Sequence, residues 1–316
     1  FALLGLFGAA RAFYNPARQA MVPNLVVPEH LTRALAPIGS VNKVATISGP
    51  LAGGLLYGLG APAAYGVSLA FFLAAAALIA ALPAVPQRLS AGRRGWSEIL
   101  AGVRFIRRKR IILGAISLDL FVVLLGGAVA LLPVYARDVL AIGAVGLGLL
   151  RAAPAAGAIL VALVLMNRPI ARHAGTIMFA AVAGFALFTL VFALSKTVWL
   201  SILALALAGG CDMVSVLIRS TLVQLHTPDE LRGRVNAVNM VFIGASNELG
   251  GFRAGTVAAL VGPIAAIAGG AVTALGICAL WYRAFPELRE ASRLDGEDGP
   301  LGGVPPATAA ASSEPA

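Results

Sequence analysis

The chain has 316 residues, of which 59% are hydrophobic and only 12% are charged. Soluble domains carry about twice that share of charge, so the composition excludes an ordinary soluble protein and predicts an all-α, polytopic membrane protein. The net charge of +10 would fit a nucleic-acid-binding protein only if the basic residues gathered on one folded surface. Both cysteines, Cys211 and Cys278, lie in apolar segments, so neither a disulfide nor a metal site is expected.

Nine apolar segments are candidates for membrane-spanning helices, which need about 20 residues each. The first, residues 1 to about 14, looks like the middle of such a helix. It lacks the basic start and the cleavage site of a signal peptide, so we expect a sequence truncated at its N-terminus. The other eight segments are 35–59, 63–82, 111–135, 145–166, 176–194, 198–224, 235–261 and 263–282.

A polar stretch at residues 84–110 divides the predicted membrane domain. Residues 1–83 hold the first three predicted helices, and residues 111–285 hold the other six. Residues 286–316 are rich in Pro, Gly, Ala, Ser and acidic side chains. Such a composition buries too little apolar surface to fold, so we expect a disordered tail there.

The central stretch contains one helical pattern. Ser97 is a candidate N-cap for a helix that runs to Arg110, and Ile99, Val103 and Ile106 recur on one face of it. This pattern predicts an amphipathic helix on the inner membrane surface. The alternative is a basic, solvated linker.

The basic residues gather in alternate loops. If the C-terminus is cytoplasmic, only Arg137 and Lys196 fall on the outer side, while Arg151 and Arg253 fall within the membrane. All the others lie on the cytoplasmic side, as the positive-inside rule requires. The net charge therefore reflects membrane orientation, and no nucleic-acid partner is expected.

A few charged residues fall inside the predicted spans. A charge at the membrane centre costs at least about 2.5–3.5 kcal/mol, so it is seldom there without a partner or a task. The acids are Asp119, Asp212 and Glu248, and the bases are Arg151 and Arg253, while Arg219 is expected close enough to the inner face to reach water. Two ion pairs would leave one carboxylate over, and we hypothesise that Asp119 or Asp212 carries a coupling proton. The alternative is that all three acids are paired structurally.

Two further polar features lie along the last helices. Asp212 and Arg219 are seven residues apart, so they share a helix face two turns apart. Asn247 precedes Glu248 in a polar run within the span 235–261, and it is a candidate for the substrate path.

Residues 49–54 read Gly-Pro-Leu-Ala-Gly-Gly inside a predicted span. Gly49, Gly53 and Gly54 would let helices approach closely, and Pro50 would bend its own helix. Both plain packing and a gating role are open for this motif.

The loop between the spans 198–224 and 235–261 has a helix-start signature. Thr227, Pro228 and Glu230 fit a capping box with proline at the first helical position. We expect Arg232 and Arg234 to anchor this cytoplasmic loop to lipid phosphate.

Several of these pieces resemble the major facilitator superfamily, and within it the bacterial exporters of siderophores and macrolides. The matching segments are RAFYNPARQA at 11–20, GPLAGG at 49–54, SLDLFVVLLGGAVALLPVYARDVL at 117–140, GLGLLRAAPAAGA at 146–158, DMVSVLIRSTLVQLHTPDELRGRV at 212–235 and GASNELG at 244–250. The resemblance implies a twelve-helix fold of which helices four to twelve are present. It also implies that the helices carrying Arg11, Asp119 and Asp212 face the substrate path.

The resemblance implies a secondary active transporter in the bacterial inner membrane, working by alternating access as a monomer without a cofactor. Its expected partners are protons, the lipid bilayer and a small molecule such as a siderophore, a drug or another amphipathic compound. Lipid or lysophospholipid translocation and an inactive truncated remnant are alternatives. An enzyme is not expected, because the chain has neither GxSxG, HExxH nor a GxxxxGK[ST] phosphate loop.

Overall fold

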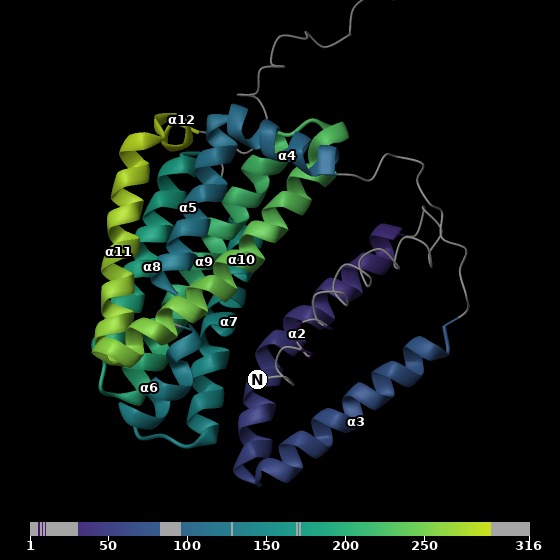
Figure 1. Ribbon diagram of the computed structural model, residues 1–316, viewed down its shortest axis with the longest axis vertical. Helices are drawn as coiled ribbons and strands as arrows, with labels where there is room; N and C mark the ends of the chain where they lie inside the picture. Colours follow the sequence, from purple (N-terminus) through teal and green to yellow (C-terminus); the bar gives the residue numbers. More distant parts are fainter. Residues whose placement is uncertain are drawn as a thin grey trace, which may run out of the picture. The chain divides into compact units, whose positions relative to one another are not determined.

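The computed structural model describes residues 31–82 and 96–291 apart from residues 128, 169 and 171, together with Leu6, Gly8 and Ala10. Within this part of the chain the secondary structure is helical and contains no β-strand (Figure 1). The prediction of an all-α fold is confirmed. Six of the described helices are long and apolar enough to cross a membrane, and they match the predicted spans 63–82, 111–135, 145–166, 176–194, 198–224 and 263–282.

The chain divides into two compact units, and the first comprises residues 1–94 and 142–152. It contains α2 (Leu31–Gly58), α3 (Ala61–Ala80) and the start of α7 (Ala144–Asn167). Gly60 joins α2 to α3 with a φ of 124°, a conformation that favours glycine. Residues 61–80 of α3 include none that is buried.

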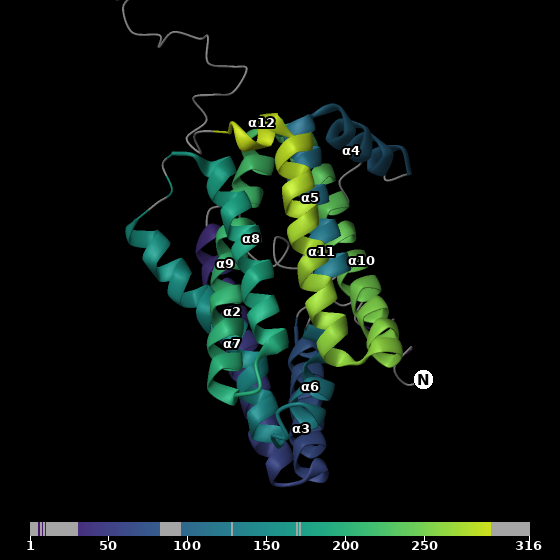
Figure 2. The ribbon, with the colours of Figure 1, turned by 90° about the vertical axis from the view of Figure 1, so that its left-hand side faces the viewer.

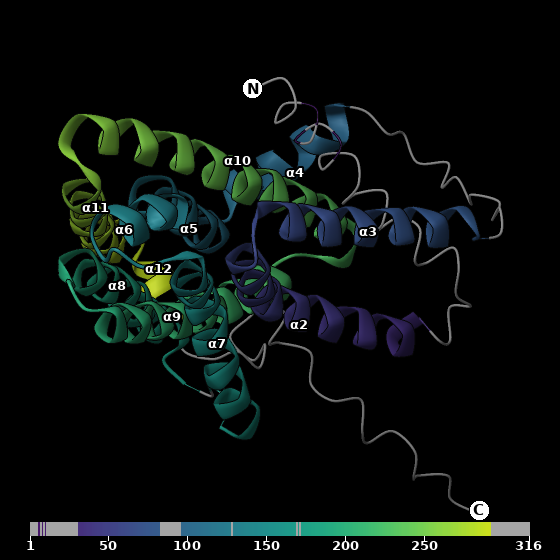
Figure 3. The same cartoon turned by 90° about the horizontal axis from the view of Figure 1, so that it is seen from below.

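The second unit comprises residues 95–141 and 153–316 and holds the rest of α7. Its other elements are α4 (Trp96–Arg108), α5 (Arg110–Gly126), the 3-10 helix η2 (Val129–Leu131), α6 (Leu132–Asp138), α8 (Ala174–Leu194), α9 (Val198–Leu225), α10 (Asp229–Val261), α11 (Pro263–Ala284) and α12 (Pro286–Arg289). Helix α8 packs along α9 and α11, and α5 packs against α10 and α11 (Figures 2 and 3).

Small residues let these helices approach closely, as is usual for helices that pack in membranes. A Cβ atom added at Gly157 of α7 would lie 1.8 Å from the carbonyl oxygen of Ala206 in α9, and one at Gly209 would lie 2.0 Å from the carbonyl oxygen of Pro154. The backbones of α7 and α9 are therefore in direct contact here. Larger side chains, among them Leu118, Met178, Phe179, Ile218 and Leu222, fill the core between α5, α8 and α9.

The predicted span 111–135 is not one continuous helix. Helix α5 ends at Gly126, and η2 and then α6 follow. The Gly126-Gly127 pair disfavours helix, and Pro133 cannot donate a backbone hydrogen bond to a preceding turn. The apolar run conceals this break, because hydropathy does not register backbone hydrogen bonding.

Helix α4 forms where an amphipathic helix is predicted, and part of its apolar face packs against α10. Ile106 is buried with Val235 and Val238 of α10. Gly102 allows close contact, since a Cβ atom there would lie 3.1 Å from the carbonyl oxygen of Arg234. These contacts hold α4 against α10, and its position on the membrane surface stays a prediction.

The predicted tail, residues 286–316, begins with ordered structure. Leu288 of α12 is fully buried, and Glu287 forms an ion pair with Arg110 at 3.0 Å. The phenyl ring of Phe285 occupies the space beside Gly114, where a Cβ atom would come within 2.8 Å of it. Composition alone missed this segment because its order depends on apolar side chains that fit the ends of α5 and α8. Residues 292–316 lie outside the described part of the chain.

Candidate functional site

A buried ion pair joins α5 to α9. The guanidinium group of Arg219 contacts the carboxylate of Asp119, and their side chains are only 7% and 16% exposed. The expectation that Arg219 reaches water is therefore wrong. The sequence placed Arg219 on the same face of α9 as Asp212 and named no partner for it; the structure pairs it with Asp119 of α5.

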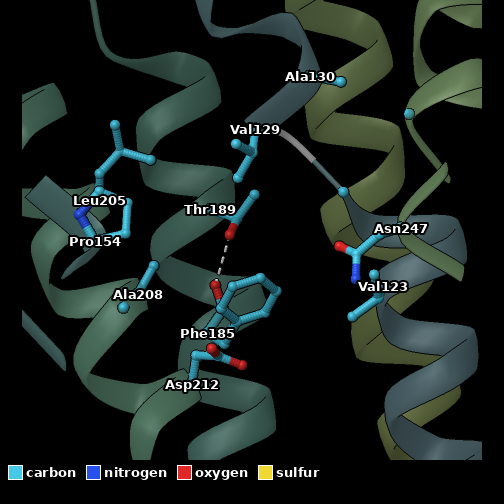
Figure 4. A pocket seen from close by; sticks show the side chains of 13 residues that line it. Val123, Val129, Ala130, Pro154, Phe185, Thr189, Leu205, Ala208, Asp212 and Asn247 are labelled. Carbon is cyan, nitrogen blue, oxygen red and sulfur yellow. Dashed lines mark hydrogen bonds between the residues drawn. The ribbon is translucent and has the colours of Figure 1, made fainter. Parts of the chain in front are cut away.

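Asp212 lies roughly 10 Å before Arg219 along α9 and lines a cavity of about 230 Å³ inside the second unit. Figure 4 shows the Asp212 side chain on one side of this cavity and Asn247 of α10 on the other. The full set of lining residues is Val123, Gly127, Val129, Ala130, Pro154, Phe185, Thr189, Leu205, Ala208, Gly209, Asp212, Asn247 and Gly251.

The cavity opens where α5 breaks. Val123 from the last turn of α5, Gly127 from the break and Val129 and Ala130 from η2 all line it. A continuous α5 would carry regular backbone hydrogen bonds through this region. The break instead leaves irregular backbone beside a cavity, which is one of the settings in which membrane proteins tolerate such backbone.

Arg253 stabilises the broken end of α5. Its Nε donates a hydrogen bond to the carbonyl oxygen of Leu124 at 3.0 Å, one of the last four carbonyls that have no partner within their own helix. A cation at this position also opposes the negative end of the helix dipole. Gly250 lets α10 come close, since a Cβ atom there would lie 2.8 Å from the carbonyl oxygen of Val123.

The remaining charged candidates lie elsewhere. Glu248 is exposed, and it is not among the described residues that line the cavity. Arg151 is exposed on α7, in the segment 142–152 of the first unit. Arg11 lies outside the described residues. Thus the structure brings Asp212 and Asn247 together at one cavity and Asp119 and Arg219 in one ion pair.

The glycine motif of α2 shows one close contact within the first unit. A Cβ atom at Gly54 would lie 2.7 Å from the carbonyl oxygen of Ala144, and the carbonyl oxygen of Pro50 approaches Gly148 equally tightly. Gly49 and Gly53 have no described atom within 4 Å of an added Cβ atom. The close approach therefore involves Pro50 and Gly54, which are four residues apart on α2.

The loop before α10 differs from the predicted capping box. Helix α10 follows Pro228 without a side-chain cap among the described residues. The hydroxyl of Thr227 instead donates to the carbonyl oxygen of Val223, at the end of α9. Arg232 is exposed and Arg234 is half-buried in the first turns of α10.

Sequence reasoning missed the cavity residues of α8. Thr189 and Phe185 lie one turn apart on this helix, and both face the cavity (Figure 4). The hydroxyl of Thr189, well inside the apolar run 176–194, was the signal available for them. Thr189 is buried and donates its hydroxyl hydrogen to the carbonyl oxygen of Phe185 at 2.8 Å.

A discontinuous membrane helix beside a cavity with an intramembrane carboxylate is typical of secondary transporters. Comparison with known families agrees, since the model of the transmembrane secretion effector family matches residues 1–298. The chain therefore belongs to this family of the major facilitator superfamily and is a multi-pass membrane transporter.

Individual relatives have the same kind of function. The chain is 28% identical to enterobactin exporters named EntS from Shigella dysenteriae serotype 1, Escherichia coli O81 and Shigella boydii serotype 18. Each alignment covers 289 residues, which is 91% of this chain and 69% of the relative. These relatives and the family together indicate export across a membrane as the class of activity.

Proposed function

We propose that this protein is a proton-coupled exporter of a siderophore or a similar amphipathic small molecule, with Asp212 as the residue that carries the coupling proton. The observation that supports this most directly is the position of Asp212 at the cavity beside the break in α5. A carboxylate in such a place can exchange a proton with a cavity that opens to water, whereas a carboxylate within packed protein cannot.

The two other intramembrane acids are less suited to this role. Asp119 contacts Arg219 in a buried pair, and protonating Asp119 would leave the arginine charge buried without its counter-ion. Removing one partner of such a pair costs about 3–5 kcal/mol. Glu248 is exposed, as Asp212 is, but it is not among the described residues that line the cavity. Asp212 therefore combines intramembrane depth with access to a cavity.

The proposal also covers the orientation of the protein in the membrane and its transport cycle. The distribution of basic residues favours a cytoplasmic C-terminus, and the relatives' bacterial origin favours the inner membrane. The exporter would act as a monomer by alternating access, with its nine predicted helices as the fourth to twelfth of the superfamily fold. The siderophore class rests on the relatives that export enterobactin.

Transport into everted membrane vesicles tests the proposal. With an acidic interior and enterobactin outside, vesicles that contain the protein should accumulate enterobactin, and a protonophore should abolish the accumulation. Asp212→Asn should reduce the gradient-driven rate at least about tenfold, which corresponds to about 1.4 kcal/mol. Asp138→Asn, which changes a surface acid paired with Arg137, is the matched control and should leave the rate unchanged.

The result that contradicts the proposal is accumulation by Asp212→Asn at the rate of the unmodified protein. Accumulation that persists with the protonophore would contradict the proton coupling while leaving export in place.

A further inference from the structure

The polar groups on the cavity wall share one property: they offer hydrogen-bond acceptors to its interior. Among the described lining residues, the polar side chains are those of Thr189, Asp212 and Asn247. An ionised carboxylate only accepts hydrogen bonds, and its two oxygens have about four acceptor sites. Asp212 can therefore accept from a ligand in addition to any contact within the protein.

Hydrogen bonds within the protein use the donor groups of Thr189 and Asn247, so these side chains also present acceptors to the cavity. The single hydroxyl hydrogen of Thr189 is donated to the carbonyl oxygen of Phe185 at 2.8 Å, so its oxygen is left with acceptor capacity. The amide nitrogen of Asn247 donates to the carbonyl oxygen of Ile243 at 2.8 Å. This contact turns the amide oxygen toward the cavity, as Figure 4 shows.

The backbone adds to this bias. Helix α5 ends at Gly126, directly beside the lining residues Val123 and Gly127. The C-terminal end of a helix carries a partial negative charge, equivalent to roughly half an elementary charge. Arg253 offsets part of it by binding the carbonyl oxygen of Leu124, but Arg253 is not among the described residues that line the cavity. The potential at the cavity therefore favours donors and cations.

Size and apolar lining define the rest of the ligand. Phe185, Val129 and Leu205 form apolar walls around the three polar groups. The volume of about 230 Å³ exceeds the roughly 150 Å³ that holds one benzene ring in an engineered cavity. It falls below the roughly 300–1,000 Å³ of sites for drug-sized ligands. One substituted ring fits, and a whole large substrate does not.

We propose that this cavity is a specificity subsite for a ring-sized apolar group that carries hydrogen-bond donors, such as a phenol or an aromatic ammonium group, with Asn247 as a specificity-determining residue. The inference rests on the proposed export function, because the group would be one part of the exported molecule. The acceptors of Asp212, Asn247 and Thr189 select donors. A ring that carries only acceptors would offer no donor to the buried hydroxyl oxygen of Thr189 or to the more exposed acceptors of Asp212 and Asn247. A site that hydrogen-bonds a donor on its ligand discriminates against the analogue that lacks this donor.

Equilibrium binding of small probes to the protein in nanodiscs tests the subsite without any gradient. The probes are phenol, its methyl ether anisole, which has the same ring but no donor, and benzylamine, which is a cationic donor. We expect phenol or benzylamine to bind at least tenfold more tightly than anisole. Whichever of phenol and benzylamine binds more tightly shows whether the subsite prefers a neutral or a charged donor.

Two variants link the binding to this cavity. Asn247→Leu removes an acceptor at similar size and should weaken the donor probes at least tenfold while improving the relative affinity of anisole. Gly251→Leu should block all three probes by filling the cavity, since a Cβ atom at Gly251 meets Ala130 at an ordinary distance of 3.5 Å. Asn236→Leu, at an exposed position of the same helix, is the matched control and should leave binding unchanged.

Equal affinity for phenol, benzylamine and anisole would overturn the inference, and so would donor binding that persists in both cavity variants. These results are separate from those of the transport assay. Selective probe binding together with absent gradient-driven transport would refute the proposed function alone. Proton-driven export with unselective binding would refute the subsite alone.

Discussion

Two turns of α9 separate two different environments for a carboxylate. At the level of Arg219, the acid Asp119 of α5 is held in a buried ion pair. At the level of Asp212, a cavity is lined by residues of α9, by the last turn of α5, which ends at Gly126, and by the residues that follow it. Helix continuity therefore decides the difference: a continuous α5 encloses a charge with its partner, whereas a broken α5 leaves a charge beside open space.

The contrast also explains why both acids remain in a membrane domain. A buried pair is seldom more stable than well-packed apolar side chains of similar volume, but it is costly to break by removing one partner. The level of Arg219 is thus suited to fixing α5 against α9. The level of Asp212 is suited to binding and releasing a proton or a ligand.

Breaking the ion pair should have the largest effect on stability. Arg219→Met leaves the Asp119 carboxylate buried without its partner, so we expect a loss of about 3–5 kcal/mol in the free energy of unfolding. Chemical denaturation in mild detergent measures this loss. The double variant Asp119→Leu with Arg219→Met should recover most of it, and an equal loss in the double variant would contradict a purely electrostatic cause.

The contact between α7 and α9 should be nearly as sensitive. Gly157→Ala places a methyl group against the backbone of Ala206, and overpacking of this kind costs about 1–3 kcal/mol or more. Gly269→Ala in α11 is the control, because no described atom lies within 4 Å of an added Cβ atom there. The control should be neutral or slightly stabilising. Equal melting temperatures for the two variants would argue against the close approach.

Loss of the support at the helix break should have an intermediate effect. Arg253→Met removes the charged hydrogen bond to Leu124, so we expect about 1.5–3 kcal/mol of destabilisation. Hydrogen exchange of the backbone amides near residues 124–131 should accelerate in this variant. Arg283→Met, at an exposed position of α11, should change neither quantity.

The smallest effect on stability is expected at the cavity. Asp212→Asn keeps the size of the side chain and one acceptor oxygen at an exposed position beside the cavity, so the free energy of unfolding should change by less than about 1 kcal/mol. Asp119→Asn should cost clearly more, because it leaves the buried charge of Arg219 without a carboxylate. Denaturation curves of the two variants, recorded side by side, compare the two levels of α9 directly. The reverse order would contradict the assignment of Asp119 to structure.

The sequence was sufficient for the helices and for the charges within them. Apolar runs of spanning length identify the six described membrane helices, and the charges at 119, 212 and 219 stand out against them. The partner of Arg219 was not predictable, because its pairing with Asp119 depends on how α5 packs against α9. Packing between helices does not follow from the periodicity of either one.

The break in α5 and the order of α12 were missed for related reasons. Gly126, Gly127 and Pro133 were visible in the sequence, but the surrounding hydropathy favoured a continuous span. Leu288 lies in a segment of polar composition, and its burial depends on a site between α5 and α8 that only the tertiary structure creates. The cavity depends on the same break, so its residues on α8 could not be inferred.

The most direct test of the division between the two acids is substrate-driven proton movement in everted vesicles. Addition of enterobactin should release protons from the acidified interior, and a pH-sensitive dye reports this release. The double variant Asp119→Leu with Arg219→Met should retain the response because the pair serves structure, whereas Asp212→Asn should abolish it. A response that survives in Asp212→Asn and disappears in the folded double variant would contradict the account.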